Sequence, residues 1–264
     1  MKKTCLLAVL ALAAVLLVLP VGAKAEMYVE GYIGGAFAGD ANSDLVANVP
    51  TAGQTVVGTL PGHAQPAVLG GLKIGTWFVK EGFLGYNYPD WMKYLGFYLD
   101  FCYHRLDLKN ENFNSKLYTG GVFTTNLSTD FQTEGTAATL AFMFAARYGF
   151  FQDSEVPFGR LQPYIAVGPA ILFSTQEPKL NFLTTGQTLD AGSQGSTDIA
   201  LAVDAGIRYM ALKNVSIDAS FKYRWANPSY SYSGAVSGTG APVSFKYEPT
   251  YNLFSFQLGA AYHF

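Results

Sequence analysis

Cysteine, charge and long hydrophobic runs are all scarce in this 264-residue sequence. One of its two cysteines lies within the first 25 residues, so an intramolecular disulfide in the remainder is excluded. Charged residues make up 14% of the chain and form no basic stripe, which argues against a nucleic-acid partner. Beyond residue 25, no apolar run approaches the roughly 18 residues of a membrane-spanning helix.

The first 25 residues predict a signal peptide. A charged start, Lys2 and Lys3, precedes the apolar run 6–19, and residues 23–25, Ala-Lys-Ala, supply a small-x-small cleavage site. The run is shorter than the roughly 20 residues of a membrane span. We therefore expect a mature chain of one domain, 26–264, with 14 basic and 19 acidic residues once the three lysines of the signal are removed.

Tyrosine, phenylalanine and glycine are abundant, with 17, 20 and 28 copies, and the large side chains recur with a two-residue period. Segment 215–225 shows the pattern most clearly. Because successive side chains of a strand point to opposite faces, it separates an apolar face from a charged one. The apolar face holds Val215, Ile217, Ala219, Phe221, Tyr223 and Trp225, and the other holds Ser216, Asp218, Ser220, Lys222 and Arg224.

The same alternation recurs along the chain and predicts eight strands. They are expected at 28–37, 67–78, 94–104, 136–148, 161–174, 198–209, 215–225 and 254–264. Each is long enough to cross the hydrocarbon of a bilayer at a tilt of about 45°. The faces opposite the bulky residues mix small residues with charges of both signs, as a narrow barrel interior requires.

The connections between these strands alternate in length. Those at 38–66, 107–135, 175–197 and 226–251 are long and rich in Gly, Ser, Thr, Asn and Pro, whereas those at 79–93, 149–160 and 211–214 are shorter. Long loops on one side and short turns on the other are typical of outer-membrane barrels with periplasmic termini. The sequence therefore predicts an all-β, transmembrane, antiparallel up-and-down β-barrel in the outer membrane.

Four stretches resemble the superfamily of small outer membrane β-barrels, the OmpA-like and OmpW-like proteins that include many "porin family" proteins. They are Glu30-Gly-Tyr-Ile-Gly-Gly35, Tyr94-Leu-Gly-Phe-Tyr-Leu-Asp-Phe101, Gln162-Pro-Tyr-Ile-Ala-Val-Gly-Pro169 and Gly259-Ala-Ala-Tyr-His-Phe264. The resemblance implies a final strand read by the barrel-assembly machinery, with Phe256, Leu258, Tyr262 and Phe264 as the assembly signal. Alternatively, Phe264 is only an interfacial girdle residue. Outer membrane lipid and lipopolysaccharide are the other implied partners.

Inward-facing charges are the main candidate site. The acidic set is Glu30, Asp100, Asp204 and Asp218, and the basic set is Lys73, Arg147, Arg208, Lys222 and Arg224, with His104 beside them. An eight-stranded barrel is just wide enough for side chains to fill, and an unpaired buried charge costs several kcal/mol. We expect a salt-bridge network that plugs the barrel, with a polar pore or proton-linked gate as the alternative. Arg147 or Arg208 is the expected partner of Asp100 or His104.

Motifs for other chemistry are weak, so we expect no enzyme, no cofactor and no metal. His63 and His263 have no evident metal-ligand companions. The sequence also lacks the His-x-Ser spacing that would indicate a lipid-modifying enzyme. The predicted function is a structural or surface-interaction barrel with a closed lumen. The alternatives are a narrow facilitator for small, hydrophobic solutes and, least supported, a lipid-modifying enzyme. An aromatic-rich fourth loop, 223–251, suits either surface recognition or a plain barrel extension.

Overall fold

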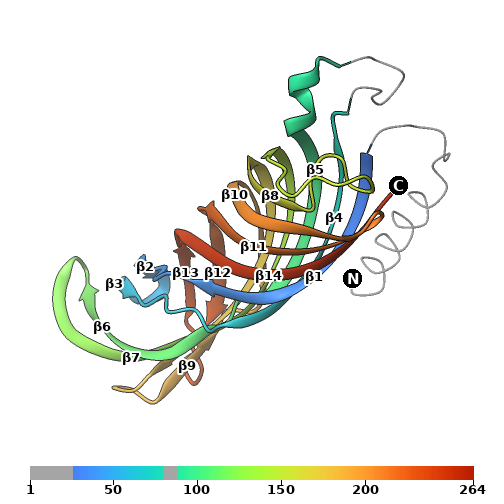
Figure 1. Ribbon diagram of the computed structural model, residues 1–264. Helices are drawn as coiled ribbons and strands as arrows, with labels where there is room; N and C mark the ends of the chain where they lie inside the picture. Colours follow the sequence, from blue (N-terminus) through green and yellow to red (C-terminus); the bar gives the residue numbers. More distant parts are fainter. Residues whose placement is uncertain (1–25, 80–87) are drawn as a thin grey trace.

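The computed structural model describes residues 26–79 and 88–264, so the predicted signal peptide lies outside the described residues. Antiparallel β-strands form almost all of it (Figure 1). The strands are β1 Glu26–Ala38, β2 Ser43–Val49, β3 Gln54–Leu60, β4 Ala67–Trp77, β5 Leu95–Arg105, β6 Leu108–Thr119, β7 Val122–Arg147, β8 Leu161–Phe182, β9 Gln187–Asp190, β10 Gln194–Leu212, β11 Val215–Ala226, β12 Tyr230–Ala235, β13 Pro242–Tyr247 and β14 Tyr251–His263. Two short 3-10 helices are η1 Pro50–Ala52 and η3 Asp90–Tyr94. No helix of the described ranges is long and apolar enough to cross a membrane.

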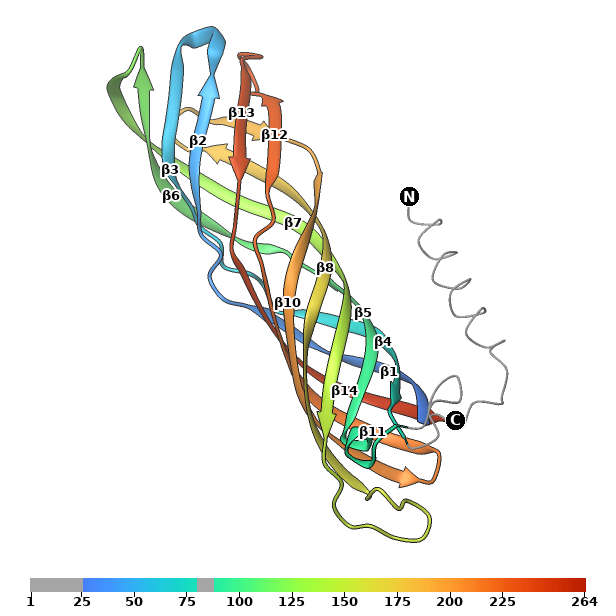
Figure 2. The same ribbon diagram turned by 90° about the horizontal axis from the view of Figure 1, so that it is seen from above.

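Eight of the strands close into a barrel. Around the ring they follow the order β1, β4, β5, β7, β8, β10, β11 and β14, and the last pairs with the first. These eight match the eight predicted segments, four of which extend one residue beyond the observed strand, so the predicted fold class is confirmed. The carboxyl end of β14 and the start of β1 lie at the end with the short turns (Figure 2). The segments that link the barrel strands at the opposite end are the long ones.

The long connections are not irregular loops, which corrects the sequence prediction. They fold into β2, β3, β6, β9, β12 and β13 and into the outer parts of β7 and β8. β7 has 26 residues, more than twice the roughly 9–11 of a transmembrane strand. The prediction began this strand at residue 136 because the apolar-outward pattern starts there, although the backbone pairing extends back to Val122.

These outer strands form a second ring on the membrane barrel. We call this ring of β2, β3, β6, outer β7, outer β8, β9, β12 and β13 the upper barrel; it occupies the end far from the carboxyl terminus (Figure 2). Two of its seams are thin. β13 and β2 share one registered pair, Ser244 with Asn48, and β9 meets the chain after β12 through the single bridge of Leu189 with Val236.

The polarity of β7 inverts along its length. In its upper half, the outward side chains are polar: Asn126, Ser128, Asp130, Gln132, Glu134 and Thr136. In its lower half they are apolar: Ala138, Leu140, Phe142, Phe144 and Ala146. The inward face shows no such inversion: it passes from large buried side chains, Leu127 and Phe131, to small ones such as Ala141 and Ala145. The upper half therefore has the pattern of a barrel in water, and the lower half that of a barrel in lipid.

Neighbouring β8 inverts at the same level. Its outward residues Ile171 and Phe173 give way to Thr175 and Glu177. Thr175 is paired in register with Thr136 of β7, and their hydroxyl oxygens lie 2.8 Å apart. The apolar outward stretch below this pair, 138–148 on β7, has the length needed to cross the hydrocarbon.

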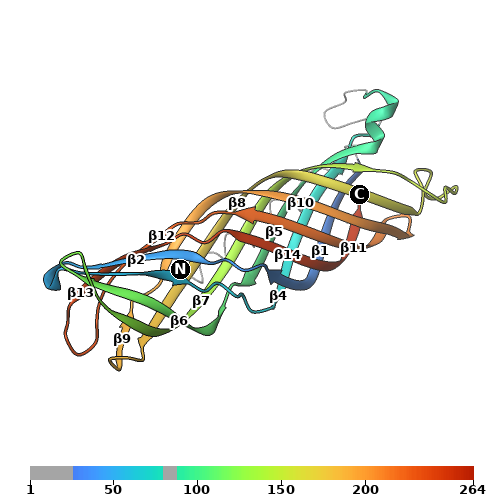
Figure 3. The same cartoon turned by 90° about the vertical axis from the view of Figure 1, so that its left-hand side faces the viewer.

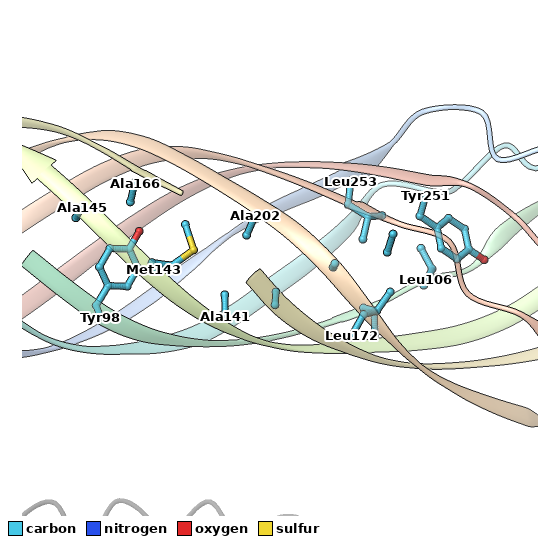
Figure 4. Close-up of a cluster of buried hydrophobic side chains, with 14 of the residues drawn as sticks. Tyr98, Leu106, Ala141, Met143, Ala145, Ala166, Leu172, Ala202, Tyr251 and Leu253 are labelled. Carbon is cyan, nitrogen blue, oxygen red and sulfur yellow. The ribbon is translucent and has the colours of Figure 1, made fainter. Parts of the chain in front are cut away.

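The interior of the membrane barrel is asymmetric. β7, β8 and β10 turn mainly small side chains inward, and Figure 4 shows Ala141, Ala145, Ala166 and Ala202 lining the space beside Met143 and Tyr98. Long side chains from the other strands fill the room that these alanines leave. The strands cross the long axis of the molecule obliquely, as closure of a narrow barrel requires (Figure 3).

Candidate functional site: the ion-paired interior

All ten residues predicted for the interior network are buried, with at most 4% of their surface exposed. The two-residue period explains this placement, since each lies on the face of its strand opposite the lipid-facing residues. They do not form one continuous group, however. Seven lie together in the middle of the barrel, and we call Glu30, Lys73, Asp100, Asp204, Arg208, Asp218 and Lys222 the central cluster.

Lys73 on β4 is the hub of the central cluster. Its Nζ lies 3.1 Å from Glu30 Oε1, 3.4 Å from Asp204 Oδ2 and 3.6 Å from Asp218 Oδ1. Glu30 is its registered neighbour on β1, whereas Asp204 belongs to β10, directly across the ring. One ammonium group therefore links three carboxylates across the full width of the lumen.

Two further cations complete the pairing. Arg208 Nη2 lies 2.5 Å from Glu30 Oε2, and its Nε lies 3.5 Å from Asp218 Oδ2. Lys222 on β11 forms an ion pair and hydrogen bond with Asp100 on β5, again the strand on the opposite side of the ring. Each of the four carboxylates thus has at least one cation within 4 Å.

Buried tyrosines supply further hydrogen bonds to three of the carboxylates. Tyr32 donates to Asp100 at 2.5 Å, Tyr98 to Asp204 at 2.8 Å and Tyr164 to Asp218 at 2.9 Å. Lys73 Nζ also lies within 6 Å of the ring centres of all three tyrosines. The sequence analysis gave none of the three a role. Tyr32 and Tyr98 each lie an even number of residues from an inward charged residue on the same strand. That position is the sequence signal that could have identified these two tyrosines.

The other three predicted residues lie apart from the central cluster. Arg147 is at the short-turn end, where it donates to Glu26 at 2.5 and 2.8 Å and stacks against the rings of Trp77 and Phe158. His104 donates from Nδ1 to the carbonyl oxygen of its neighbour Arg105 at 2.8 Å. Arg224 donates to Thr139 at 3.3 Å.

The expectation that Arg147 or Arg208 meets Asp100 or His104 is therefore wrong. Asp100 pairs with Lys222 and Tyr32, because its side chain reaches across the lumen and not to an arginine of a neighbouring strand. Glu26, the partner of Arg147, was not among the predicted residues. As the first residue after the predicted cleavage site, it precedes the segment in which the sequence pattern was evident.

A serine, a histidine and an acid lie in a row at the short-turn end. Ser216 Oγ is 2.8 Å from His263 Nε2, and His263 Nδ1 is 3.9 Å from Glu26 Oε1. The row resembles a nucleophile, a base and an orienting acid, which the sequence spacing did not indicate. Ser216, however, has no exposed surface, and the Glu26 carboxylate already binds Arg147. This geometry fixes the end of β14 to β11 and does not offer the serine to a substrate.

His63, in the segment between β3 and β4, has the acidic companions that its sequence position did not reveal. Its Nδ1 lies 2.7 Å from Glu111 Oε2, and its Nε2 lies 3.1 Å from Asp40 Oδ1. The hydrogen bond and the charge of Glu111 raise the pKa of His63 above its usual value. Within residues 26–79 and 88–264, no group of three such side chains is arranged to hold a metal ion.

A layer of tyrosines separates the central cluster from the upper barrel. Tyr230 donates to Ser174 Oγ at 2.6 Å, and Tyr232 donates to the Gln176 carbonyl oxygen at 3.0 Å. Gln176 in turn donates to Tyr251 Oη at 3.1 Å and accepts from Thr133 at 2.6 Å. The aromatic residues of the fourth long connection therefore turn inward as a packed and hydrogen-bonded layer.

The four residues of the suggested assembly signal form one row on the outside of β14. Phe256, Leu258, Tyr262 and Phe264 are each at least half exposed. The rings of Tyr262 and Phe264 are in contact, with centroids 5.2 Å apart. The row faces the lipid, as either interpretation of the final strand requires.

A lipid-facing apolar wall around an ion-paired interior defines a transmembrane β-barrel. Residues 11–264 match the family model described as outer membrane protein beta-barrel domain, so the chain belongs to this outer membrane family. No curated protein matches the sequence.

The chain is similar to several solved structures. Neisserial surface protein A is 14% identical, with 90% of this chain and 97% of that chain covered and a TM-score of 0.42. OprG from Pseudomonas aeruginosa is 14% identical, with 91% and 96% covered and a TM-score of 0.45. A major outer membrane protein from Thermus thermophilus is 13% identical, with 91% and 100% covered and a TM-score of 0.45.

Proposed function

We propose that this protein is a non-enzymatic outer membrane barrel whose lumen is closed by the central cluster and whose upper barrel provides a surface for interaction outside the cell. The carrying observation is the pair of cross-lumen links, Lys73 to Asp204 and Lys222 to Asp100. Each joins strands on opposite sides of the eight-stranded ring.

Closure follows from the cost of separating these charges. A continuous water path through the lumen requires at least one of the links to open, which leaves buried charges without partners at a cost of several kcal/mol. The tyrosine layer adds a second obstruction above the cluster. This arrangement favours a closed barrel over the alternative of a narrow facilitator for small apolar solutes, and over a proton-linked gate.

The buried position of Ser216 supports a non-enzymatic role. An acyl- or lipid-transferring serine must reach its substrate from solvent or from the bilayer, and Ser216 reaches neither. The lipid-modifying hypothesis therefore has a histidine and a serine in contact, but this serine is not accessible to a substrate.

The proposal includes the orientation and the partners. The protein is exported by the Sec route, its termini are periplasmic and its upper barrel lies outside the cell. The short turns at the end where β14 finishes support this orientation. Membrane lipid and lipopolysaccharide would contact the apolar wall, and the barrel-assembly machinery would recognise the row of Phe256, Leu258, Tyr262 and Phe264. We assign no specific surface ligand to the outer face of the upper barrel.

Conductance across a planar bilayer tests the closed lumen. We expect the purified wild-type protein to give no stable ohmic steps, because the central cluster blocks the ion path. The double variant Lys73→Ala/Lys222→Ala removes both cross-lumen links and should show steps or a strongly increased leak. A surface pair, Lys109→Ala/Lys116→Ala, is the matched control and should behave as wild type. Stable steps from the wild type would count against closure and in favour of the facilitator.

A further inference from the structure

The upper barrel encloses an apolar chamber above the membrane region. Its volume is about 220 Å³, and fifteen residues from β2, β3, β6, β7, β8, β9, β13 and the adjoining turns line it. Twelve of the fifteen are apolar, and none is charged. Its walls include Leu45, Val56, Leu127, Leu180, Leu189 and Phe245, all of which are buried.

The few polar side chains of the chamber lie at its outer end. Gln54 follows the tip of the β2–β3 hairpin, Thr185 belongs to the turn between β8 and β9, and Gln187 is the first residue of β9. All three are neutral and can both donate and accept hydrogen bonds. The chamber thus has a neutral polar mouth and an apolar body.

The inner end of the chamber is closed toward the membrane barrel. Phe131, which is fully buried, lies two inward positions below the chamber residue Leu127 and packs on Tyr247 with ring centroids 5.9 Å apart. The tyrosine layer and the central cluster follow below. A molecule in the chamber therefore has no direct path into the lumen.

We propose that this chamber is a binding site for one small, uncharged molecule with an apolar body and a neutral polar group, such as a medium-chain aliphatic alcohol. An apolar cavity of about 150 Å³ stays dry and takes up benzene, so the larger chamber accommodates a somewhat larger apolar molecule. Burial of the apolar body contributes roughly 25 cal/mol per Å² of surface removed from water. The polar group remains at the mouth beside Gln54, Thr185 and Gln187.

Charge and size exclude other occupants. An ion or a carboxylate would lose its hydration without gaining an opposite charge among the lining residues. A long acyl chain exceeds the volume, and the floor at Phe131 stops it from extending downward. The inference goes beyond the proposed function, because binding in the chamber does not depend on whether the lumen below is closed.

Binding can be measured on the full mature chain in lipid nanodiscs by NMR of leucine methyl groups. Titration with 1-hexanol or 1-octanol should shift the methyl signals of Leu127 and Leu189 along a saturable, one-site curve. Leu201 faces the lipid and should show only the non-saturating shift of alcohol partitioning into the bilayer. Affinity should rise from hexanol to octanol and fall at least tenfold at 1-hexadecanol, and octanoate at neutral pH should bind at least tenfold more weakly than octanol.

A matched pair of variants locates the site. Val56 and Val243 point into the chamber from β3 and β13, whereas Val46 and Val57 point outward from β2 and β3. Val56→Phe/Val243→Phe should weaken octanol binding at least tenfold, and Val46→Phe/Val57→Phe should leave it unchanged. Folding of each is checked by comparing the gel migration of boiled and unboiled samples, and either inward single variant replaces the double if it fails to fold.

Several results would overturn the inference. These are shifts at Leu127 that rise without saturation, equal octanol affinity in the inward and outward variants, or affinity that increases with chain length up to hexadecanol. Each would show that the alcohols partition into the bilayer and do not occupy the chamber. The conductance of the lumen is a separate measurement, so failure here leaves the closed-barrel proposal standing.

Discussion

Replacing Lys73 with methionine is expected to destabilise the folded barrel by about 3–5 kcal/mol, the range for removing one partner from a buried ion network. The variant keeps the length and most of the volume of the side chain but removes the ammonium group. Glu30, Asp204 and Asp218 would then share fewer cations in a space with no exposed surface. Urea-induced unfolding in lipid vesicles, followed by tryptophan fluorescence, measures the change.

Two controls separate this effect from a general loss of charge. Lys179 forms exposed ion pairs with Glu134 and Glu177 on the upper barrel, so Lys179→Met should change the free energy of unfolding little. Adding Asp204→Asn to Lys73→Met removes one of the stranded carboxylates and should restore part of the lost stability. If Lys73→Met were as mild as Lys179→Met, the ion-paired core would not hold the barrel together.

Replacing Phe142 with arginine should cost about 2–4 kcal/mol, the range for a cation on the lipid face near the middle of the bilayer. Phe142 is an outward residue of β7 near the centre of the apolar stretch 138–148. Gln132→Arg lies on the same face of the same strand, ten residues into the upper barrel, and should have no such cost. Refolding into vesicles over a urea series measures both variants.

The difference between the two arginine variants tests the inverted polarity. Both keep the strand pairing, since each outward side chain makes no contribution to the backbone ladder. If arginine lowered the free energy of unfolding equally at positions 132 and 142, both positions would lie in the same environment. That result would contradict a membrane boundary at Thr136 and Thr175.

The membrane barrel could be predicted from the sequence because lipid and lumen impose opposite demands on alternate residues. Segment 215–225 shows this directly: it lies within β11, and its charged face is the buried one. The upper barrel could not be predicted in the same way. Outward Asp130, Gln132 and Glu134 break the lipid-facing pattern, and only the pairing of β7 with β6 and β8 shows that the strand continues.

The alternation of side chains along each strand predicts that the residues of the central cluster are buried. It does not predict which of them form ion pairs with one another. Strand parity places Asp100 and Lys222 inward without stating that β5 and β11 stand on opposite sides of the ring. That relation depends on strand number, tilt and stagger, which a local pattern does not contain. The same reason explains why Ser216 and His263, 47 residues apart, were not expected to meet.

The same set of strands thus removes its apolar surface from water in two ways. Below Thr136 and Thr175 the apolar face is outward and meets lipid, so the polar interior must neutralise its own charges. Above them the outer face is polar, and the apolar face packs inward around the chamber. On the strands that continue through the boundary, β7 and β8, the outward face changes from polar to apolar without a change in backbone parity.

Spin labels placed one at a time along the outward face of β7, in a Cys102→Ser background, test this central claim most directly. Positions 126, 128, 130, 132, 134 and 136 should be accessible to a water-soluble relaxation agent, and positions 138, 140, 142, 144 and 146 to oxygen dissolved in the bilayer. The account predicts a single reversal between Thr136 and Ala138. Uniform water accessibility along the strand, or a reversal within the upper half, would contradict it.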